Sequence, residues 1–83
     1  MLNLDIRDEL PVGSIVLDNA YYDNSIIGTT LDGRVIYDFN LMVEEYMTDN
    51  DCSELEAVEW IEYNTMRAIP YMGDKAPVVV NWI

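Results

Sequence analysis

The sequence predicts a small single α+β domain over residues 1–83. A β-hairpin and a C-terminal strand form a sheet that packs against two helices of about residues 39–48 and 54–69. Three observations support this class. β-branched residues flank an Asp-Gly turn, two segments have apolar residues at helical spacing, and three valines follow Pro77. With 83 residues, of which 51% are hydrophobic, the chain can form one core but not two.

The N-terminal half is predicted to contribute short strands. Ser14–Leu17 is an apolar run compatible with a strand, and the polar Tyr21–Asn24 segment is predicted to be a loop. Ser25–Thr30 and Arg34–Tyr37 then lie on either side of Leu31–Gly33. Because β-branched runs around Asp-Gly are a strong local signal for a turn between antiparallel strands, we expect a hairpin here.

The first helix is predicted from Phe39 to Thr48, with Asp38 as its N-cap. At 3.6 residues per turn its apolar residues share one face. They are Phe39, Met42, Val43, Tyr46 and Met47. The polar tract Asp49–Asp51 is expected to end the helix.

The second helix is predicted to begin at Ser53, which forms a capping-box pattern with Glu56, and to run to about Ile69 before Pro70. Its apolar arc comprises Leu55, Ala57, Val58, Ile61, Thr65, Met66, Ala68 and Ile69. Val78–Val80 then reads as a short apolar strand in a covered position of the sheet.

Charge limits the partners of this chain. It has 16 Asp and Glu residues against 4 Lys and Arg, no histidine, and a net charge of −12. Such a chain repels nucleic acid and anionic membranes, and it attracts basic protein surfaces. One stretch is acidic with no basic residue, and its acids are Glu44, Glu45, Asp49, Asp51, Glu54, Glu56, Glu59 and Glu62.

The residue inventory argues against catalysis, so we expect no enzyme activity and no cofactor. Without histidine, His-dependent nucleophiles and His-metal sites do not exist, and the glycines are too scattered for a phosphate loop. Asp49–Ser53 matches the first half of a calcium loop. However, Glu54 stands where glycine is needed and Trp60 where the bidentate glutamate is needed, so we expect no metal site. The single Cys52 permits no internal disulfide and indicates a cytoplasmic protein; we expect it to be an unreactive turn residue.

Acid spacing on the second helix suggests nucleic-acid mimicry. Residues 54–62 rise about 12 Å and carry four carboxylates, roughly one per 3 Å, close to the 3.4 Å per charge of one DNA strand. The alternative is a solvated helix face without a partner.

Three further side chains have two interpretations each. Trp60 and Tyr63 lie outside the apolar arc, and they are either covered by the N-terminal segment and the Tyr21–Tyr22 loop or form an interface hot spot. Tyr63 can also stack with Arg67 one turn later. Glu62 falls inside the arc, where an unpaired charge is costly. We expect a buried structural ion pair with Arg34 rather than a site residue.

Two strings resemble a group of small acidic proteins from bacteria, prophages and phages. They are Asp32–Tyr37 (DGRVIY) and Glu56–Tyr71, within which EYNTMRAIPY is the more specific. The resemblance covers about residues 14–80. No activity is established for the group. The resemblance implies a mobile-element context, in which small acidic proteins often inhibit host defence nucleases, as anti-CRISPR proteins do.

The resulting expectation is a non-enzymatic phage-type protein that binds a basic host protein and blocks its nucleic-acid channel. The expected binding residues are Glu44, Glu45, Asp49, Asp51, Glu56, Glu59, Trp60 and Tyr63. The alternative is a structural adaptor that self-associates through its aromatic side chains, and a homo-oligomer fits the small core. A small enzyme would need a pocket that perturbs a carboxylate.

Overall fold

The described part of the chain is built on a mixed three-stranded sheet in the order β1-β2-β3, with β1 antiparallel and β3 parallel to β2. The computed structural model describes residues 9–18 and 20–81, so the ends of the expected 1–83 domain lie outside the described residues. In chain order the elements are η2 (Ala20–Ser25), β1 (Ile26–Thr29), β2 (Val35–Asp38), α1 (Phe39–Asn50), α2 (Glu54–Trp60), η3 (Ile61–Met66), η4 (Ile69–Tyr71) and β3 (Val78–Val80). The predicted α+β class is confirmed.

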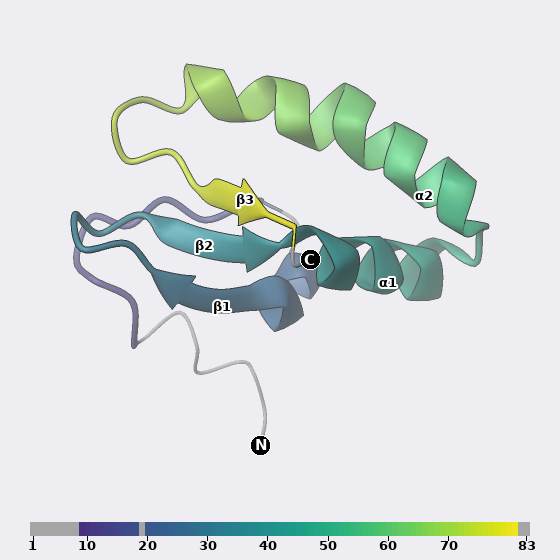
Figure 1. Cartoon of the computed structure of the whole chain (residues 1–83), viewed down its shortest axis with the longest axis horizontal. Coiled ribbons are helices and arrows are strands. Elements are labelled where there is room, and N and C mark those ends of the chain that lie inside the picture. The colour runs from purple at the N-terminus through teal and green to yellow at the C-terminus, as the bar shows by residue number, and fades with distance from the viewer. Residues whose placement is uncertain (1–8, 19, 82–83) are drawn as a thin grey trace.

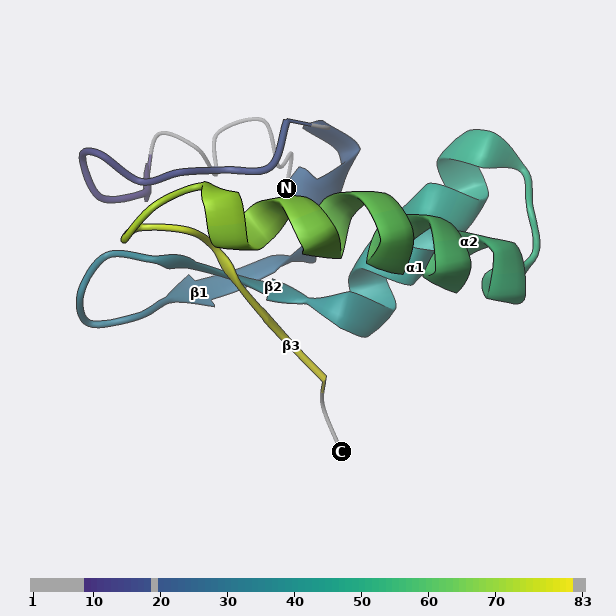
Figure 2. The ribbon, with the colours of Figure 1, turned by 90° about the horizontal axis from the view of Figure 1, so that it is seen from above.

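The helices lie at one end of the sheet and along its length. α1 continues from the end of β2, and the chain then turns back so that α2 and η3 pass α1 and run above the strands (Figure 1). Seen from above, residues 9–18 and the strands lie on either side of this long helix (Figure 2). The core forms where these parts meet.

That core is drawn from the N-terminal segment, β2 and both helices. Its buried residues are Leu17, Tyr22, Val35, Tyr37, Met42, Val43, Ala57 and Ile61. β3 is an edge strand whose three valines are only half-buried, so the expected covered position is wrong. Because β3 pairs with β2 alone, its other backbone edge has no strand partner among the described residues.

The predicted hairpin is confirmed. Thr30 N–H donates to the Arg34 carbonyl at 2.8 Å, and Gly33 N–H donates to the Thr30 carbonyl at 3.1 Å. Gly33 has φ +89°, a left-handed conformation that a side chain would strain. The pairing of β1 with β2 also shifts its register between Ile26 and Gly28.

The start of α1 is also as predicted. The Asp38 carboxylate accepts a hydrogen bond from Leu41 N–H at 3.2 Å, which makes Asp38 the N-cap. Met42 and Val43 are buried on the expected apolar face. The remaining residues of this face are half-buried against the core; they are Phe39, Tyr46 and Met47.

The second helix exists but is not uniform. α2 and η3 form one continuous helix that ends at Ala68, and Pro70 lies inside the following 3-10 turn instead of beyond the last turn. η3 is π-helical, so each of its turns holds more residues than an α-helical turn. Ala57 and Ile61 are buried as expected, but Leu55 is 67% exposed because it lies about 200° around the helix from Ala57.

Two predictions for the N-terminal segment are wrong. Ser14–Leu17 forms no strand; Leu17 N–H instead donates to the Tyr37 hydroxyl at 2.9 Å, so a side chain takes the place of a strand partner. The expected loop Tyr21–Asn24 belongs to the 3-10 helix η2, in which Tyr22 is buried; the Tyr21 side chain is outside the described part. None of the described helices has the length and apolar character needed to span a bilayer.

Candidate protein-binding face

The turn between α1 and α2 places acidic residues at one end of the molecule (Figure 1). α1 continues to Asn50, beyond the expected Thr48, because Asp51 adopts φ +52° and its N–H donates to the Met47 carbonyl at 2.8 Å. Aspartate is one of the few residues with a side chain that visits this left-handed conformation routinely. The acidic turn therefore has a defined backbone shape.

The predicted capping box fixes the start of α2. Glu56 N–H donates to Ser53 Oγ at 3.2 Å, and Ser53 N–H donates to Glu56 Oε1 at 3.0 Å. The bond from the Ser53 backbone, with a second from its hydroxyl, lowers the pKa of Glu56. Burial raises the pKa of the neighbouring Cys52 thiol, and the Glu56 and Asp51 carboxylates raise it further, which disfavours a reactive thiolate.

Most of the expected binding acids are exposed. We call the following set the acidic corner: Glu44, Glu45, Asp49, Asp51, Glu54, Glu56 and Glu59. Only Glu45 is half-buried, and its carboxylate accepts a hydrogen bond from Asn24 Nδ2 of η2 at 3.1 Å. The corner is thus held by caps at its turn and by one side-chain bond to η2.

The acids do not form a single strip. Glu44 and Glu54 line the same shallow depression of about 430 Å³ between α1 and the start of α2, together with Asn40, Val43 and Met47. Glu45 projects about 100° away from Glu44 around α1 and contacts η2. The structure therefore adds Glu54 to the expected set and divides the set between two flanks.

Trp60 packs against the other helix. Its ring stacks on Tyr46 of α1, with centroids 4.8 Å apart and an interplanar angle of 29°, and the residue remains 37% exposed. Trp60 also lines a pocket with Tyr22 and Leu17. The stacking contact with α1 is therefore the packing that the structure shows for this ring.

Tyr63 differs from Trp60. It is 68% exposed, and the Arg67 guanidinium carbon lies 4.8 Å from its ring centroid, which is the cation–π pair expected from their spacing. The two aromatic side chains were expected to anchor one interface together. The structure separates them, with Trp60 directed toward α1 and the pocket and Tyr63 toward solvent.

The expected buried pair between Glu62 and Arg34 differs from the structure. Glu62 is exposed, so it bears no burial cost, and Arg34 Nε donates to the Ala76 carbonyl at 2.7 Å. Lys75 Nζ donates to the Asp32 carbonyl. The basic residues of the described part therefore contact backbone or an aromatic ring, and none of them contacts the acidic corner.

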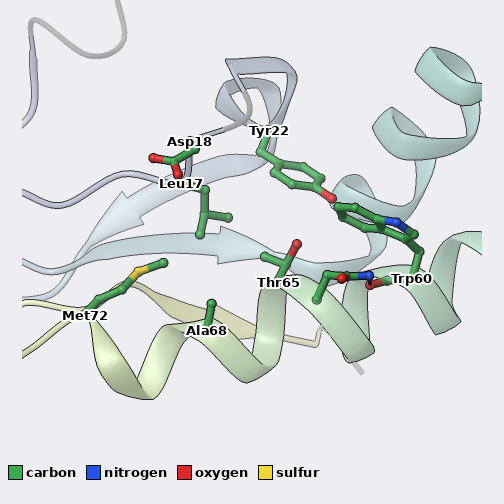
Figure 3. Close-up of a pocket in the computed structure, with 8 residues that line it drawn as sticks. Leu17, Asp18, Tyr22, Trp60, Thr65, Ala68 and Met72 are labelled. Atoms are coloured by element: carbon green, nitrogen blue, oxygen red, sulfur yellow. Dashed lines mark hydrogen bonds between the residues drawn. The ribbon is translucent and has the colours of Figure 1, made fainter.

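A pocket of about 160 Å³ lies between the long helix and the N-terminal segment. Figure 3 shows its lining, which includes Leu17, Asp18, Tyr22, Trp60, Thr65, Ala68 and Met72. Asn64 completes it, and its Nδ2 donates to the Trp60 carbonyl at 2.9 Å. No local sequence pattern indicates this pocket, because its residues come from segments far apart in the chain. The π-helical η3 also changes the number of residues per turn along the helix that lines it.

Within residues 9–18 and 20–81, no three His, Cys, Asp or Glu side chains are grouped so that they could hold a metal ion. Comparison with known protein families, curated proteins and solved structures found no match to this chain.

Proposed function

We propose that this chain is a non-enzymatic binding protein whose acidic corner docks on a basic surface of a host protein, of the kind that binds nucleic acid. One observation carries the proposal. The corner residues except Glu45 are exposed, while Arg34, Arg67 and Lys75 are engaged elsewhere, so the corner has no counter-charge within the described chain. Soluble surfaces usually intersperse both signs of charge, and a field of one sign favours steering toward an opposite one.

The specific form of the proposal is nucleic-acid mimicry. The helix that begins at Glu54 presents carboxylates at about the spacing of charges on one DNA strand. A protein groove that binds a phosphate backbone would accept them in its place. Inhibition of a host defence nuclease, in the manner of an anti-CRISPR protein, is the form that the resemblance to small phage proteins favours.

Affinity capture from a bacterial lysate tests the proposal. The wild-type chain should retain a basic nucleic-acid-binding protein at low salt and lose it at high salt, because contacts between exposed charges are screened. A partner that stays bound at high salt and is not basic would exclude this mode of binding.

Two charge-matched variants localise the surface. The corner variant combines Glu44→Gln and Glu54→Gln, and the control combines Glu9→Gln and Asp74→Asn. Because each exposed ion pair contributes about 0.2–1 kcal/mol, the corner variant should bind the captured protein roughly 2- to 30-fold more weakly at low salt. The control should change little. Equal weakening by both variants would mean that net charge, and not this corner, drives binding.

Competition then distinguishes mimicry from other acidic docking. A DNA or RNA ligand of the captured protein should displace the chain, and the chain should inhibit that protein's nucleic-acid binding. If the captured protein bound the chain and the nucleic acid at the same time, docking on a basic partner would stand but mimicry would be rejected.

The second proposal, self-association through aromatic side chains, now depends mainly on Tyr63 and Tyr71. Tyr71 is 89% exposed, whereas Trp60 is partly used within the fold. This proposal predicts a salt-insensitive oligomer by light scattering that Tyr63→Ala and Tyr71→Ala disrupt. A monomer at every salt concentration would dismiss it.

A further inference from the structure

We propose that the pocket beside Trp60 receives one arginine side chain of the basic partner. The inference rests on the proposed function, since it names a contact that the partner would make. The pocket differs from the acidic corner, because the corner attracts any cation whereas the pocket selects its occupant by shape.

The size of the pocket limits its occupant. Small-molecule sites usually enclose about 300–1,000 Å³, and a cavity of roughly 150 Å³ holds a group the size of benzene. At about 160 Å³, this pocket is too small for a cofactor and fits the end of one side chain. It opens to the surface, where its wall residue Ala68 is exposed.

The walls are apolar along their length and aromatic at one end. Leu17 and Tyr22 lie on one side, Ala68 and Met72 on the other, and Trp60 lies at the end nearest α1 (Figure 3). An arginine side chain matches these walls, because it has an apolar stem and a charged head. Its planar guanidinium also stacks on indole rings.

The polar groups of the lining are mainly acceptors. Asp18 lies at the end of the pocket opposite Trp60, and its exposed carboxylate points away from the indole ring (Figure 3). Asn64 uses its Nδ2 on the Trp60 carbonyl, which leaves its Oδ1 to accept, and the Thr65 hydroxyl can accept as well. A cation with several N–H donors satisfies such a lining, and guanidinium has five.

Position connects the pocket to the acidic corner. Trp60 stacks on Tyr46, whose chain neighbour Glu45 belongs to the corner. Trp60 itself follows Glu59 on the long helix. A basic surface held by the corner would therefore lie next to the pocket mouth, and its arginine would enter without a separate encounter.

Two peptides test the inference: a glycine-spaced arginine peptide and a glycine-spaced lysine peptide of equal length and charge. Fluorescence anisotropy gives their affinities at low and high salt, and the Trp60 indole N–H resonance reports on the pocket. We expect the arginine peptide to bind roughly fivefold more tightly, since one partly desolvated cation–π contact contributes about 1 kcal/mol. Only the arginine peptide should shift the Trp60 resonance.

Variants connect this preference to the pocket. Ala68→Leu fills it from an exposed helical position and should abolish the arginine preference, whereas Thr48→Leu, at an exposed position of α1, should keep it. Asn64→Ala removes an acceptor beside Trp60 and should reduce the preference, and Asn81→Ala, at an exposed position outside the pocket, should not. Because Asn64 is exposed, that variant tests the pocket even if Ala68→Leu fails to fold.

The outcomes separate the two proposals. Equal, salt-dependent binding of both peptides to the wild-type chain would overturn the pocket and leave the acidic corner standing. Retention of the full arginine preference in Ala68→Leu would also overturn it. If neither peptide binds at low salt, the proposed function fails, and the pocket inference fails with it.

Discussion

At one end of the molecule two basic side chains bind backbone carbonyl groups, and at the other end a group of acidic side chains meets no basic residue of the described part. The first, which we call the turn end, joins residues 11–14, 30–34 and 73–76 (Figure 1). There Arg34 donates to the Ala76 carbonyl and Lys75 to the Asp32 carbonyl. At the acidic corner, Asp51 closes the end of α1 and Ser53 closes the start of α2 instead.

The difference follows from which backbone groups each end must satisfy. The start of α2 presents N–H groups, and the Ser53 hydroxyl accepts from one of them. The end of α1 presents carbonyl groups, and the Asp51 N–H and the Asn50 side chain donate to two of them, so these helix ends are closed without any cation. At the turn end, the Ala76 and Asp32 carbonyls accept from basic side chains instead. A chain with few basic residues therefore uses two of them where donors are required, and this leaves the corner without counter-charge.

The largest expected effect lies at the turn end. Arg34→Ala removes a charged donor from the carbonyl of buried Ala76, so the free energy of unfolding should fall by about 1.5–3 kcal/mol in urea denaturation. Arg67→Ala, which loses an exposed cation–π contact, should cost no more than about 1 kcal/mol. Equal losses for the two variants would show that Arg34 does not tie the loops together.

A smaller effect is expected at the corner. Ser53→Ala removes the acceptor of Glu56 N–H, and the free energy of unfolding should fall by about 0.5–2 kcal/mol. Thr48→Ala, at an exposed position of α1, should change it by less than about 0.5 kcal/mol. If Ser53→Ala left the free energy of unfolding unchanged, the view that the helix caps stabilise this end would be contradicted.

Acid titration should show the smallest effect and distinguish the two ends. The pKa of Glu56 is lowered by hydrogen bonds from Ser53, and that of Asp32 by the Thr30 hydroxyl and then by Lys75. A lowered folded pKa adds stability above the ordinary values of 4.5 and 3.8, and this stability is lost as the pH falls through the folded pKa.

Urea unfolding across this pH range measures the two contributions. Glu56→Gln and Asp32→Asn should each flatten the acid-induced loss of stability. Added salt should reduce the Asp32 contribution in part, because its largest cause is the hydrogen bond from Thr30 and only the smaller contribution of Lys75 acts through charge, and it should leave the Glu56 contribution, which hydrogen bonds from Ser53 cause, nearly unchanged. If Glu56→Gln lost as much unfolding free energy in acid as the wild-type chain, the Glu56 carboxylate would not contribute to the stability of the capping box.

Local signals predicted much of this fold. Asp-Gly between β-branched runs gave the hairpin, and Asp38 and Ser53 marked the two helix starts. Predictions failed where a segment depends on distant partners. Leu17 N–H pairs with the Tyr37 hydroxyl instead of with a strand, and β3 lies at the edge of the sheet beside β2, with half-buried valines.

The candidate site divides in the same way. Sequence placed the acids of the corner on two helices and their turn, but it grouped Trp60 with Tyr63 and paired Glu62 with Arg34. Glu62 is exposed because it lies within about 20° of exposed Leu55 around the helix, a residue wrongly assigned to the buried arc. Trp60 meets Tyr46 because α1 packs beside α2, which a helical wheel does not show.

The sequence by itself determined the charge of this protein, the sites of its helix caps and the hairpin, because these depend on composition and on residues a few positions apart. Only the tertiary structure decided where the basic side chains go, which acids remain free and that a pocket forms beside Trp60. Those outcomes depend on contacts between residues far apart in the chain, such as Arg34 with Ala76 and Tyr46 with Trp60.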